Sequence, residues 1–189
     1  MLCRAPILLG GRAFPCGQCM PCRVNRRRIW SHRIMLVAMQ HSDSAFVTLT
    51  YSEDNVPKTA DGQLNLVPKD LQDWLKRFRK AIEPMRVRFY AVGEYGDETL
   101  RPHFHVALFG YPTCRFGNSI YSDRRLNCCP QCDTVRDTWR HGSVLLGTLE
   151  DNSAQYIAGY VTKKLTSKDD YRLKGRYPEF ARMSLHPVS

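Results

Sequence analysis

The order of strands and helices constrains what this chain can fold into more than any other feature of its sequence. Alternating apolar and β-branched residues predict four strands, at 45–51, 87–96, 103–110 and 143–150. An amphipathic helix is predicted over 68–83 and a last helix over 151–165. Because three of the strands follow one another with no helix predicted between them, we expect an α+β fold in which helices flank a central, largely antiparallel sheet.

The length of 189 residues fits a single domain with one sizeable core. We divide it into a cysteine-rich start with a basic helix (1–42), a core that carries the sheet (43–165) and a basic tail (166–189) to which no structure is assigned. Within these parts, the basic helix is expected over 23–42 and a loop-like insertion over 111–137. The last helix is expected to have Asp151, Asn152 or Ser153 as its N-cap.

The charge of the chain favours a polyanionic partner. Its 28 Lys and Arg residues against 18 Asp and Glu residues give a net charge of +10. Nucleic acid is favoured over a membrane surface, because no basic helix has an apolar face suited to lipid. The first residues form no secretory signal, so we expect a cytosolic protein. Charge alone leaves a merely solvated basic surface as an equal alternative.

Eight cysteines are many for a cytosolic protein of this length, and most of them are clustered. Two stretches with C-x-x-C spacing, far apart in the sequence, favour a structural zinc site over a disulfide framework. The alternative is a set of reduced thiols in loops. Cys3 and Cys114 stand apart from both stretches. The clustered cysteines are Cys16, Cys19, Cys22, Cys128, Cys129 and Cys132.

Two histidines stand two residues apart in the third predicted strand. His103 and His105 leave the same face of a strand, while Phe104 and Val106 point to the opposite face. Glu94 lies close to the end of the preceding strand and would come near both rings if the two strands are antiparallel neighbours. Two imidazoles and a carboxylate suit Mg²⁺ or Mn²⁺ held together with a phosphate. A His-x-His pair without such a carboxylate is often surface decoration.

Two tyrosines and a lysine share one face of the last predicted helix. Tyr156, Tyr160 and Lys163 spread over roughly 60° at helical spacing. The alternative is that the phenols are ordinary packing residues. A phenol is a poor nucleophile at neutral pH, but a nearby cation favours the phenolate and a metal ion polarises the phosphate that it attacks. Such attack on a phosphodiester would join DNA to the protein and free a 3′-hydroxyl.

Taken together, these motifs resemble those of a known family. "FVTLTY", "RPHFHVALFG" and "YIAGYVTKK" stand in the order of the three rolling-circle replication motifs of HUH endonucleases. With "CGQCMPCR" and "GEYGDETLRPHFH", they most resemble the replication initiators of gokushovirus-type microviruses. The resemblance extends from about Met1 to Leu165.

The resemblance implies a sheet-centred nuclease that starts rolling-circle replication of a circular single-stranded DNA phage in the cytoplasm of its bacterial host. It implies nicking and rejoining of the single-stranded origin through a 5′-phosphotyrosine. A host helicase and a host polymerase would be needed, because the sequence has no phosphate-binding loop of the helicase type. By the same resemblance, His103, His105 and Glu94 would bind the metal, Tyr156 and Tyr160 would be the nucleophiles, and Lys163 would be the motif lysine.

Two other functions stay open at this point. One is a transposase or relaxase with the same chemistry, although the cysteine-rich start fits it less well. The other is a non-catalytic, zinc-stabilised nucleic-acid-binding protein, which explains the charge and the cysteines but leaves the histidines and tyrosines as coincidence.

Overall fold

The computed structural model of the protein describes residues 2–96, 98–117, 128–160 and 171–184. Its centre is a five-stranded sheet in the order β6-β3-β5-β4-β7, with every neighbouring pair antiparallel. The α+β class with a central antiparallel sheet flanked by helices is therefore confirmed, and so are the four predicted strands. The strands are β3 (Ser44–Thr50), β4 (Arg88–Tyr95), β5 (Pro102–Phe109), β6 (Val144–Thr148) and β7 (Phe180–Met183).

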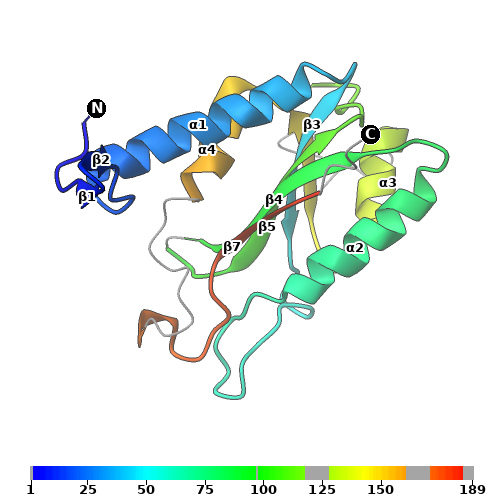
Figure 1. The fold of residues 1–189 in the computed structure, drawn as a ribbon. Coiled ribbons are helices and arrows are strands. Elements are labelled where there is room, and N and C mark those ends of the chain that lie inside the picture. The colour runs from blue at the N-terminus through cyan, green and yellow to red at the C-terminus, as the bar shows by residue number, and fades with distance from the viewer. Residues whose placement is uncertain (1, 97, 118–127, 161–170, 185–189) are drawn as a thin grey trace.

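Helices cover both faces of this sheet (Figure 1). On one face, α1 (Met20–Ala38) packs against α4 (Asp151–Gly159). On the other face, α2 (Pro68–Ala81) packs against α3 (Pro130–Trp139). A short 3₁₀ turn, η2 (Tyr171–Leu173), precedes β7.

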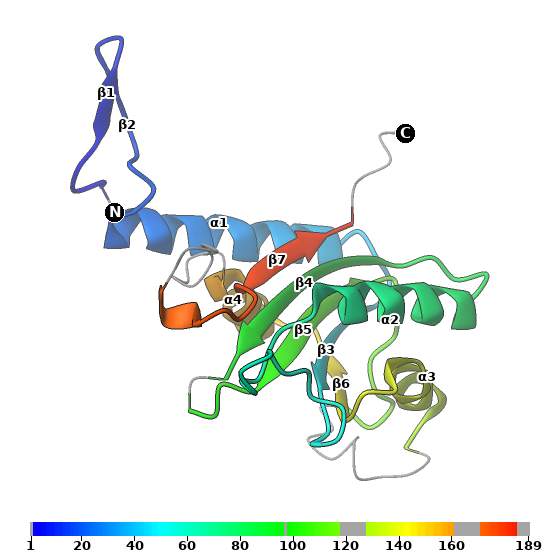
Figure 2. The same ribbon diagram turned by 90° about the horizontal axis from the view of Figure 1, so that it is seen from below.

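An exposed hairpin lies outside this three-layer body. It pairs β1 (Ile7–Leu9) with β2 (Arg12–Phe14), and all six residues are exposed. Figure 2 shows it projecting from the end of the molecule where α1 begins.

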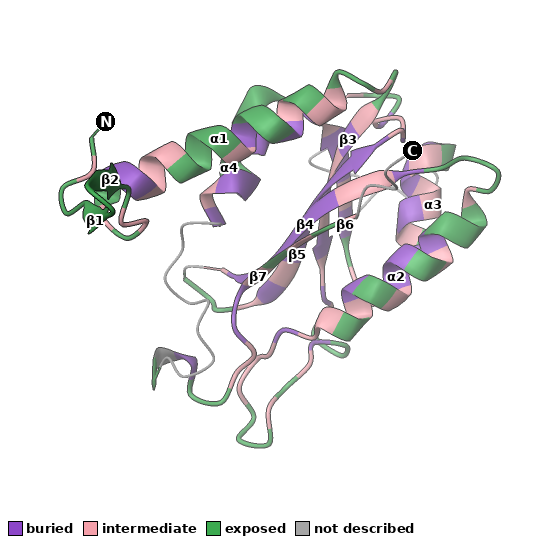
Figure 3. Cartoon of the chain, viewed as in Figure 1, coloured by how far each residue is buried: buried purple, intermediate pink, exposed green. Residues whose placement is uncertain are grey.

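The alternation of side chains along the strands gives the protein a core on each face of the sheet (Figure 3). The larger core lies under α2 and α3, where Phe104 and Val106 meet Trp74 and Trp139. The smaller core lies under α1 and α4 and includes Ile34, Val92, Ala107 and Ile157. Since β5 is the middle strand, both of its faces are covered, and His103 is its one residue that is not fully buried.

One expectation about a loop is wrong, and part of the tail, to which no structure was assigned, forms a strand. The segment 111–137, expected to be a loop, ends in α3, whose buried face is made by Cys132, Val135, Thr138 and Trp139. The tail, left without structure, supplies β7 as an edge strand beside β4.

The helix limits also differ in detail. The basic helix runs from Met20 to Ala38 instead of over 23–42. The N-cap of α4 is Glu150, whose backbone amide donates to Ser153 Oγ at 2.8 Å, so the expected Asp151, Asn152 or Ser153 is not the cap. The helix is described as far as Gly159, and residues 161–165 of the predicted helix lie outside the described residues.

Among the helices described, none combines the length and the apolarity needed to cross a bilayer.

Candidate active site

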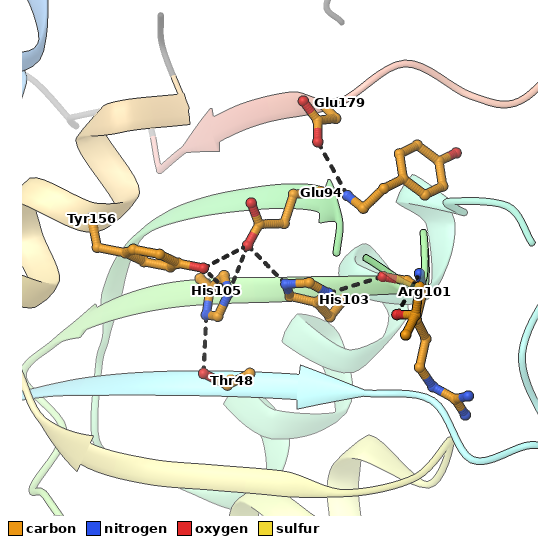
Figure 4. A network of polar contacts seen from close by, with 9 residues as sticks. Thr48, Glu94, Arg101, His103, His105, Tyr156 and Glu179 are labelled. Atoms are coloured by element: carbon orange, nitrogen blue, oxygen red, sulfur yellow. Dashed lines mark hydrogen bonds and ion pairs between the residues drawn. The ribbon is translucent and has the colours of Figure 1, made fainter. Parts of the chain in front are cut away.

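The register of two neighbouring strands brings a carboxylate and two imidazoles together. Glu94 of β4 is the direct partner of His103 on β5, and His105 lies two residues further along the same face. Glu94 Oε1 is 2.7 Å from His103 Nε2 and 2.8 Å from His105 Nε2. Figure 4 shows both rings turned toward the carboxylate. The structure thus unites the three residues singled out as metal ligands in the sequence.

Each ring is held through its other nitrogen. His103 Nδ1 lies 3.0 Å from the carbonyl oxygen of Arg101, and His105 Nδ1 lies 3.0 Å from Thr48 Oγ1 on β3 (Figure 4). A carbonyl oxygen only accepts, so His103 Nδ1 must carry a proton. Such contacts at the far nitrogen fix the orientation of a metal-binding histidine and select the nitrogen that faces the ion.

The carboxylate is almost fully enclosed yet charged. Glu94 is 1% exposed, and His105 is also buried. Burial alone would raise the pKa of Glu94, but the hydrogen bonds with His103 and His105 outweigh it and lower the pKa to about 2. Glu94 is therefore ionised at neutral pH and available as a ligand.

These residues fit a divalent cation. In neutral His103, protonation at Nδ1 leaves Nε2 as a bare acceptor 2.7 Å from an anionic oxygen. Two acceptors at that distance repel each other unless a positive charge, either a proton or a metal ion, lies between them. The three candidate ligand atoms lie within 4.8 Å of one another. One carboxylate and two imidazoles leave coordination positions free for a phosphate.

Tyr156 on α4 reaches the same centre. Its hydroxyl donates to Glu94 Oε1 at 3.1 Å and lies 3.4 Å from His105 Nε2 (Figure 4). Tyr156 as a whole is 46% exposed, so the phenol meets both the triad and solvent.

Tyr160 is set further back. It is 8% exposed and belongs to the core under α1 and α4. The centroid of its ring lies 5.3 Å from that of the Tyr156 ring. Burial raises the pKa of Tyr160 well above the ordinary value, and the hydrogen bond that its hydroxyl donates to Tyr156 raises it further. The third member of the sequence motif, Lys163, lies outside the described residues.

Thr48 was not singled out in the sequence, although it stands inside the "FVTLTY" stretch. It is the register partner of His105, and this pairing brings its hydroxyl within hydrogen-bond distance of His105 Nδ1. The only sequence signal was its position on the polar side of an alternating strand.

A basic hollow lies between α1 and α4. It has a volume of about 1140 Å³, and Arg27, Arg28 and Arg33 of α1 line it together with Gln155, the residue before Tyr156. Arg27 Nε donates to the Gln155 carbonyl oxygen at 3.0 Å, which ties the two helices together. Positive charge is therefore concentrated in a hollow that reaches the N-terminal half of α4, where Asp151 is its one acidic lining residue.

The cysteines do not form the one zinc site expected from the two C-x-x-C stretches. They gather instead in two separate clusters, and the two cysteines that stood apart in the sequence complete them. The first cluster is Cys3, Cys16, Cys19 and Cys22, and the second is Cys114, Cys128, Cys129 and Cys132.

Comparison with known proteins gives a consistent picture. Residues 44–165 match the model of a family described as replication-associated protein ORF2. The chain is 33% identical to replication-associated protein ORF2 of Spiroplasma virus 4, over 91% of this chain and 54% of that protein. It is 30% identical to replication-associated protein VP4 of Bdellovibrio phage phiMH2K, over 86% of this chain and 52% of that protein. The chain thus spans about half the length of these relatives.

Among solved structures, the N-terminal nuclease domain of minute virus of mice non-structural protein-1 aligns with 95% of this chain and 68% of that one. The identity is 12% and the TM-score is 0.21, a likeness too remote to bear on function.

Proposed function

Because this chain belongs to the family of replication-associated protein ORF2, we propose that it initiates rolling-circle replication of a small circular single-stranded DNA phage. The family membership confirms the resemblance to microvirus replication initiators drawn from the motifs. The proposed activity is nicking and rejoining of one DNA strand at the origin. The observation that carries it is the contact of the Tyr156 hydroxyl with the Glu94, His103 and His105 cluster.

In the proposed reaction, Tyr156 Oη attacks the phosphorus of the scissile phosphodiester. A bond forms between Oη and phosphorus, and the bond from phosphorus to O3′ breaks with its electron pair remaining on O3′, which takes a proton from water. The phenol proton passes to water, since Tyr156 is partly open to solvent, while Glu94 Oε1 accepts the hydrogen bond that orients the hydroxyl before the attack. The product is a 5′-phosphotyrosine ester that keeps the energy of the broken bond, so rejoining by the reverse reaction needs no ATP.

His103, His105 and Glu94 are the proposed ligands of a Mg²⁺ or Mn²⁺ ion. When bound, the ion would polarise the phosphate and stabilise charge on the leaving oxygen. The contacts from Arg101 and Thr48 hold the two rings ready for this ion before DNA arrives.

Tyr156 is the proposed first nucleophile. Its hydroxyl contacts Glu94 and the residue is about half exposed, whereas Tyr160 is buried and has a raised pKa. Tyr160 would act second, after the Tyr156 ring carries the 5′ end of the DNA and leaves its resting place. Lys163 is assigned the role of favouring the phenolate form.

The proposal extends to the rest of the chain and its partners. Residues 1–189 would act as one HUH nuclease unit, with the catalytic core at 43–165. Its substrate would be a single-stranded origin lying along the basic hollow, with a host helicase and a host polymerase acting on the nicked DNA in the bacterial cytoplasm.

The test is incubation of the purified protein with Mn²⁺ and the circular single-stranded genome of its phage, followed by mass spectrometry of the trapped adduct. We expect DNA on Tyr156, no adduct in EDTA, and none in the Tyr156→Phe, Tyr160→Phe double variant. Tyr160→Phe should still make the first cut but release few joined circles. Tyr171→Phe, at an exposed tyrosine outside the site, is the matched control.

An adduct formed by the double variant as well as by the parent would show that the nucleophile is elsewhere. First cleavage that survives Tyr156→Phe but not Tyr160→Phe would reverse the proposed order. DNA binding in EDTA with no cleavage under any divalent ion would favour a non-catalytic binding protein.

A further inference from the structure

The two cysteine clusters have the dimensions of single-ion sites. A tetrahedral ion with metal–sulfur bonds of about 2.3 Å holds its sulfurs about 3.8 Å apart. In the first cluster the Sγ atoms of Cys19 and Cys3 are 3.7 Å apart and those of Cys16 and Cys22 are 4.0 Å apart. In each cluster, all four sulfurs lie within 4.8 Å of one another.

The second cluster has the same spacing. Cys114 Sγ lies 3.7 Å from Cys128 Sγ and 4.0 Å from Cys129 Sγ. A disulfide would bring two sulfurs to about 2.05 Å, and all eight thiols are free. An iron–sulfur cluster would place its own atoms between the cysteines and hold them farther apart. One metal ion per cluster therefore fits the geometry best.

Backbone groups support the sulfurs as they do around bound zinc. The amide of Cys16 donates to Cys3 Sγ at 3.3 Å, and that of Cys19 donates to Cys16 Sγ at 3.4 Å. In the second cluster, the amides of Arg115 and Cys132 hydrogen-bond the sulfur of Cys129. Such bonds stabilise thiolates, the form in which cysteine binds a metal.

From this geometry we infer two independent structural zinc sites, each with four thiolate ligands. The hairpin site is Cys3, Cys16, Cys19 and Cys22, and the insertion site is Cys114, Cys128, Cys129 and Cys132. Zinc is the ion that four thiolates in a tetrahedron favour in a structural site. The inference goes beyond the proposed nuclease function and does not depend on it.

The insertion site would brace the sheet behind the active site. It joins the segment after β5 to the start of α3, where Cys129 is the N-cap and Cys132 lies in the first turn. At its other end, α3 holds β3 through Trp139 Nε1, which donates to the Thr50 carbonyl oxygen at 3.0 Å. Thr50 is in turn the register partner of His103. An ion that fixes the start of α3 would therefore also help to hold the part of β3 that pairs with His103.

The hairpin site would have a local effect. Its cysteines lie on either side of β1 and β2 and at the start of α1, so an ion there would close the loop that carries the exposed hairpin. Three of its four cysteines are only half-buried, whereas three of the four in the insertion site are buried. Loss of the hairpin ion should leave the sheet intact, and loss of the insertion ion should not.

The test is the metal content of the purified full chain, measured by inductively coupled plasma mass spectrometry. We expect two zinc ions per chain, and also two in a His103→Ala, His105→Ala variant, which removes imidazole binding at the active site. The Cys3→Ser and Cys114→Ser variants should each retain one zinc ion, and the variant that combines these two changes should retain none. His41→Gln, at a histidine outside both clusters, is the matched control. Cys114→Ser should lower the Tm more than Cys3→Ser.

A second measurement avoids variants that fail to fold. Titration of the wild-type chain with a thiol-specific mercurial should release both ions, and cobalt substitution should give thiolate-to-cobalt charge-transfer absorption that grows to two equivalents. A single ion, iron in place of zinc, or zinc content that is indifferent to Cys3→Ser and Cys114→Ser would overturn the inference.

Discussion

The carboxylate of Glu94 meets three side chains through one oxygen: His103, His105 and Tyr156. One atom therefore connects the proposed metal ligands to the proposed nucleophile. With its pKa at about 2, Glu94 provides the negative charge that draws a cation to the rings and accepts the hydrogen bond of the phenol. The hydroxyl of Tyr156 thus contacts the same group that is proposed to bind the ion.

Thr48 offers a test of how the imidazoles are oriented. Thr48→Val keeps the shape of the side chain but removes the hydroxyl 3.0 Å from His105 Nδ1, so the ring loses the contact that fixes its orientation. We expect the affinity for Mn²⁺ to fall about 10- to 100-fold, with nicking restored at high Mn²⁺. Isothermal titration calorimetry and a Mn²⁺ titration of nicking measure the two effects.

Thr50→Val is the matched control, since Thr50 lies two residues along on the same face. It faces His103, whose Nδ1 is held by the backbone carbonyl of Arg101 and needs no hydroxyl. Equal losses in both variants would mean that the strand as a whole, and not the Thr48 contact, determines metal affinity.

At the scale of elements, Gly93 shows how tightly β7 is fitted to the sheet. A Cβ at this position would lie 2.6 Å from Cε1 and 2.8 Å from Cζ of Phe180, the first residue of β7. It would also lie 3.2 Å from Phe104 Cδ1. Only glycine at position 93 therefore lets the Phe180 ring pack this closely against β4, one residue before Glu94.

Gly93→Ala should displace that ring and destabilise the fold. We expect the free energy of unfolding to fall by about 1–3 kcal/mol, the usual range for overpacking. Combining it with Phe180→Leu, which removes the clashing ring atoms, should cost less than the sum of the two single changes. Denaturant unfolding of the four proteins measures this coupling.

Gly96→Ala is the control, because a Cβ there meets its nearest neighbour, Thr99 Oγ1, at an ordinary 3.4 Å. Strict additivity of Gly93→Ala and Phe180→Leu would show that β7 moves away without loss and does not pack as described.

The elements that were predicted from the sequence are those with a regular pattern. The strand at 44–50 alternates cleanly, the strand at 102–109 is a largely apolar run, and α2 places Leu71, Trp74, Leu75 and Phe78 on one buried face. By contrast, α3 is short and built of Cys, Thr and Asp, which have low helix propensity. Strand β7 has only four residues and becomes a strand through pairing with β4, a long-range contact that no local pattern reveals.

The candidate site divides in the same way. The triad could be predicted because a spacing of two residues fixes the face and a short connection makes β4 and β5 neighbours. The role of Thr48 could not be predicted, because the register between β3 and β5 does not follow from the residues of either strand alone. The difference between Tyr156 and Tyr160 also depends on how α4 lies over the sheet, which helical spacing does not determine.

At the scale of the whole molecule, the two faces of the sheet differ in what they carry. The face under α2 and α3 holds the larger core, while the triad and Tyr156 lie on the face that α1 and α4 cover. Figure 1 shows these two helix pairs on opposite faces of the sheet. Part of the net charge of +10 lies in the hollow between α1 and α4, on the helices that cover the face of the proposed active site.

Charge on α1 should therefore govern the salt dependence of DNA binding. Replacing Arg28 and Arg33, which line the hollow, by Gln removes two candidate phosphate contacts. For single strands, each such contact contributes about 0.7 to the slope of log K against log salt, so the slope should become shallower by about 1.4. The same double change at Lys76 and Lys80 on α2 removes equal charge from the opposite face. Fluorescence anisotropy with a labelled single strand in EDTA, at several salt concentrations, compares the two variants. A shallower slope in the α1 variant alone places the DNA in the hollow, whereas equal changes would mean that the strand responds to net charge and not to this face.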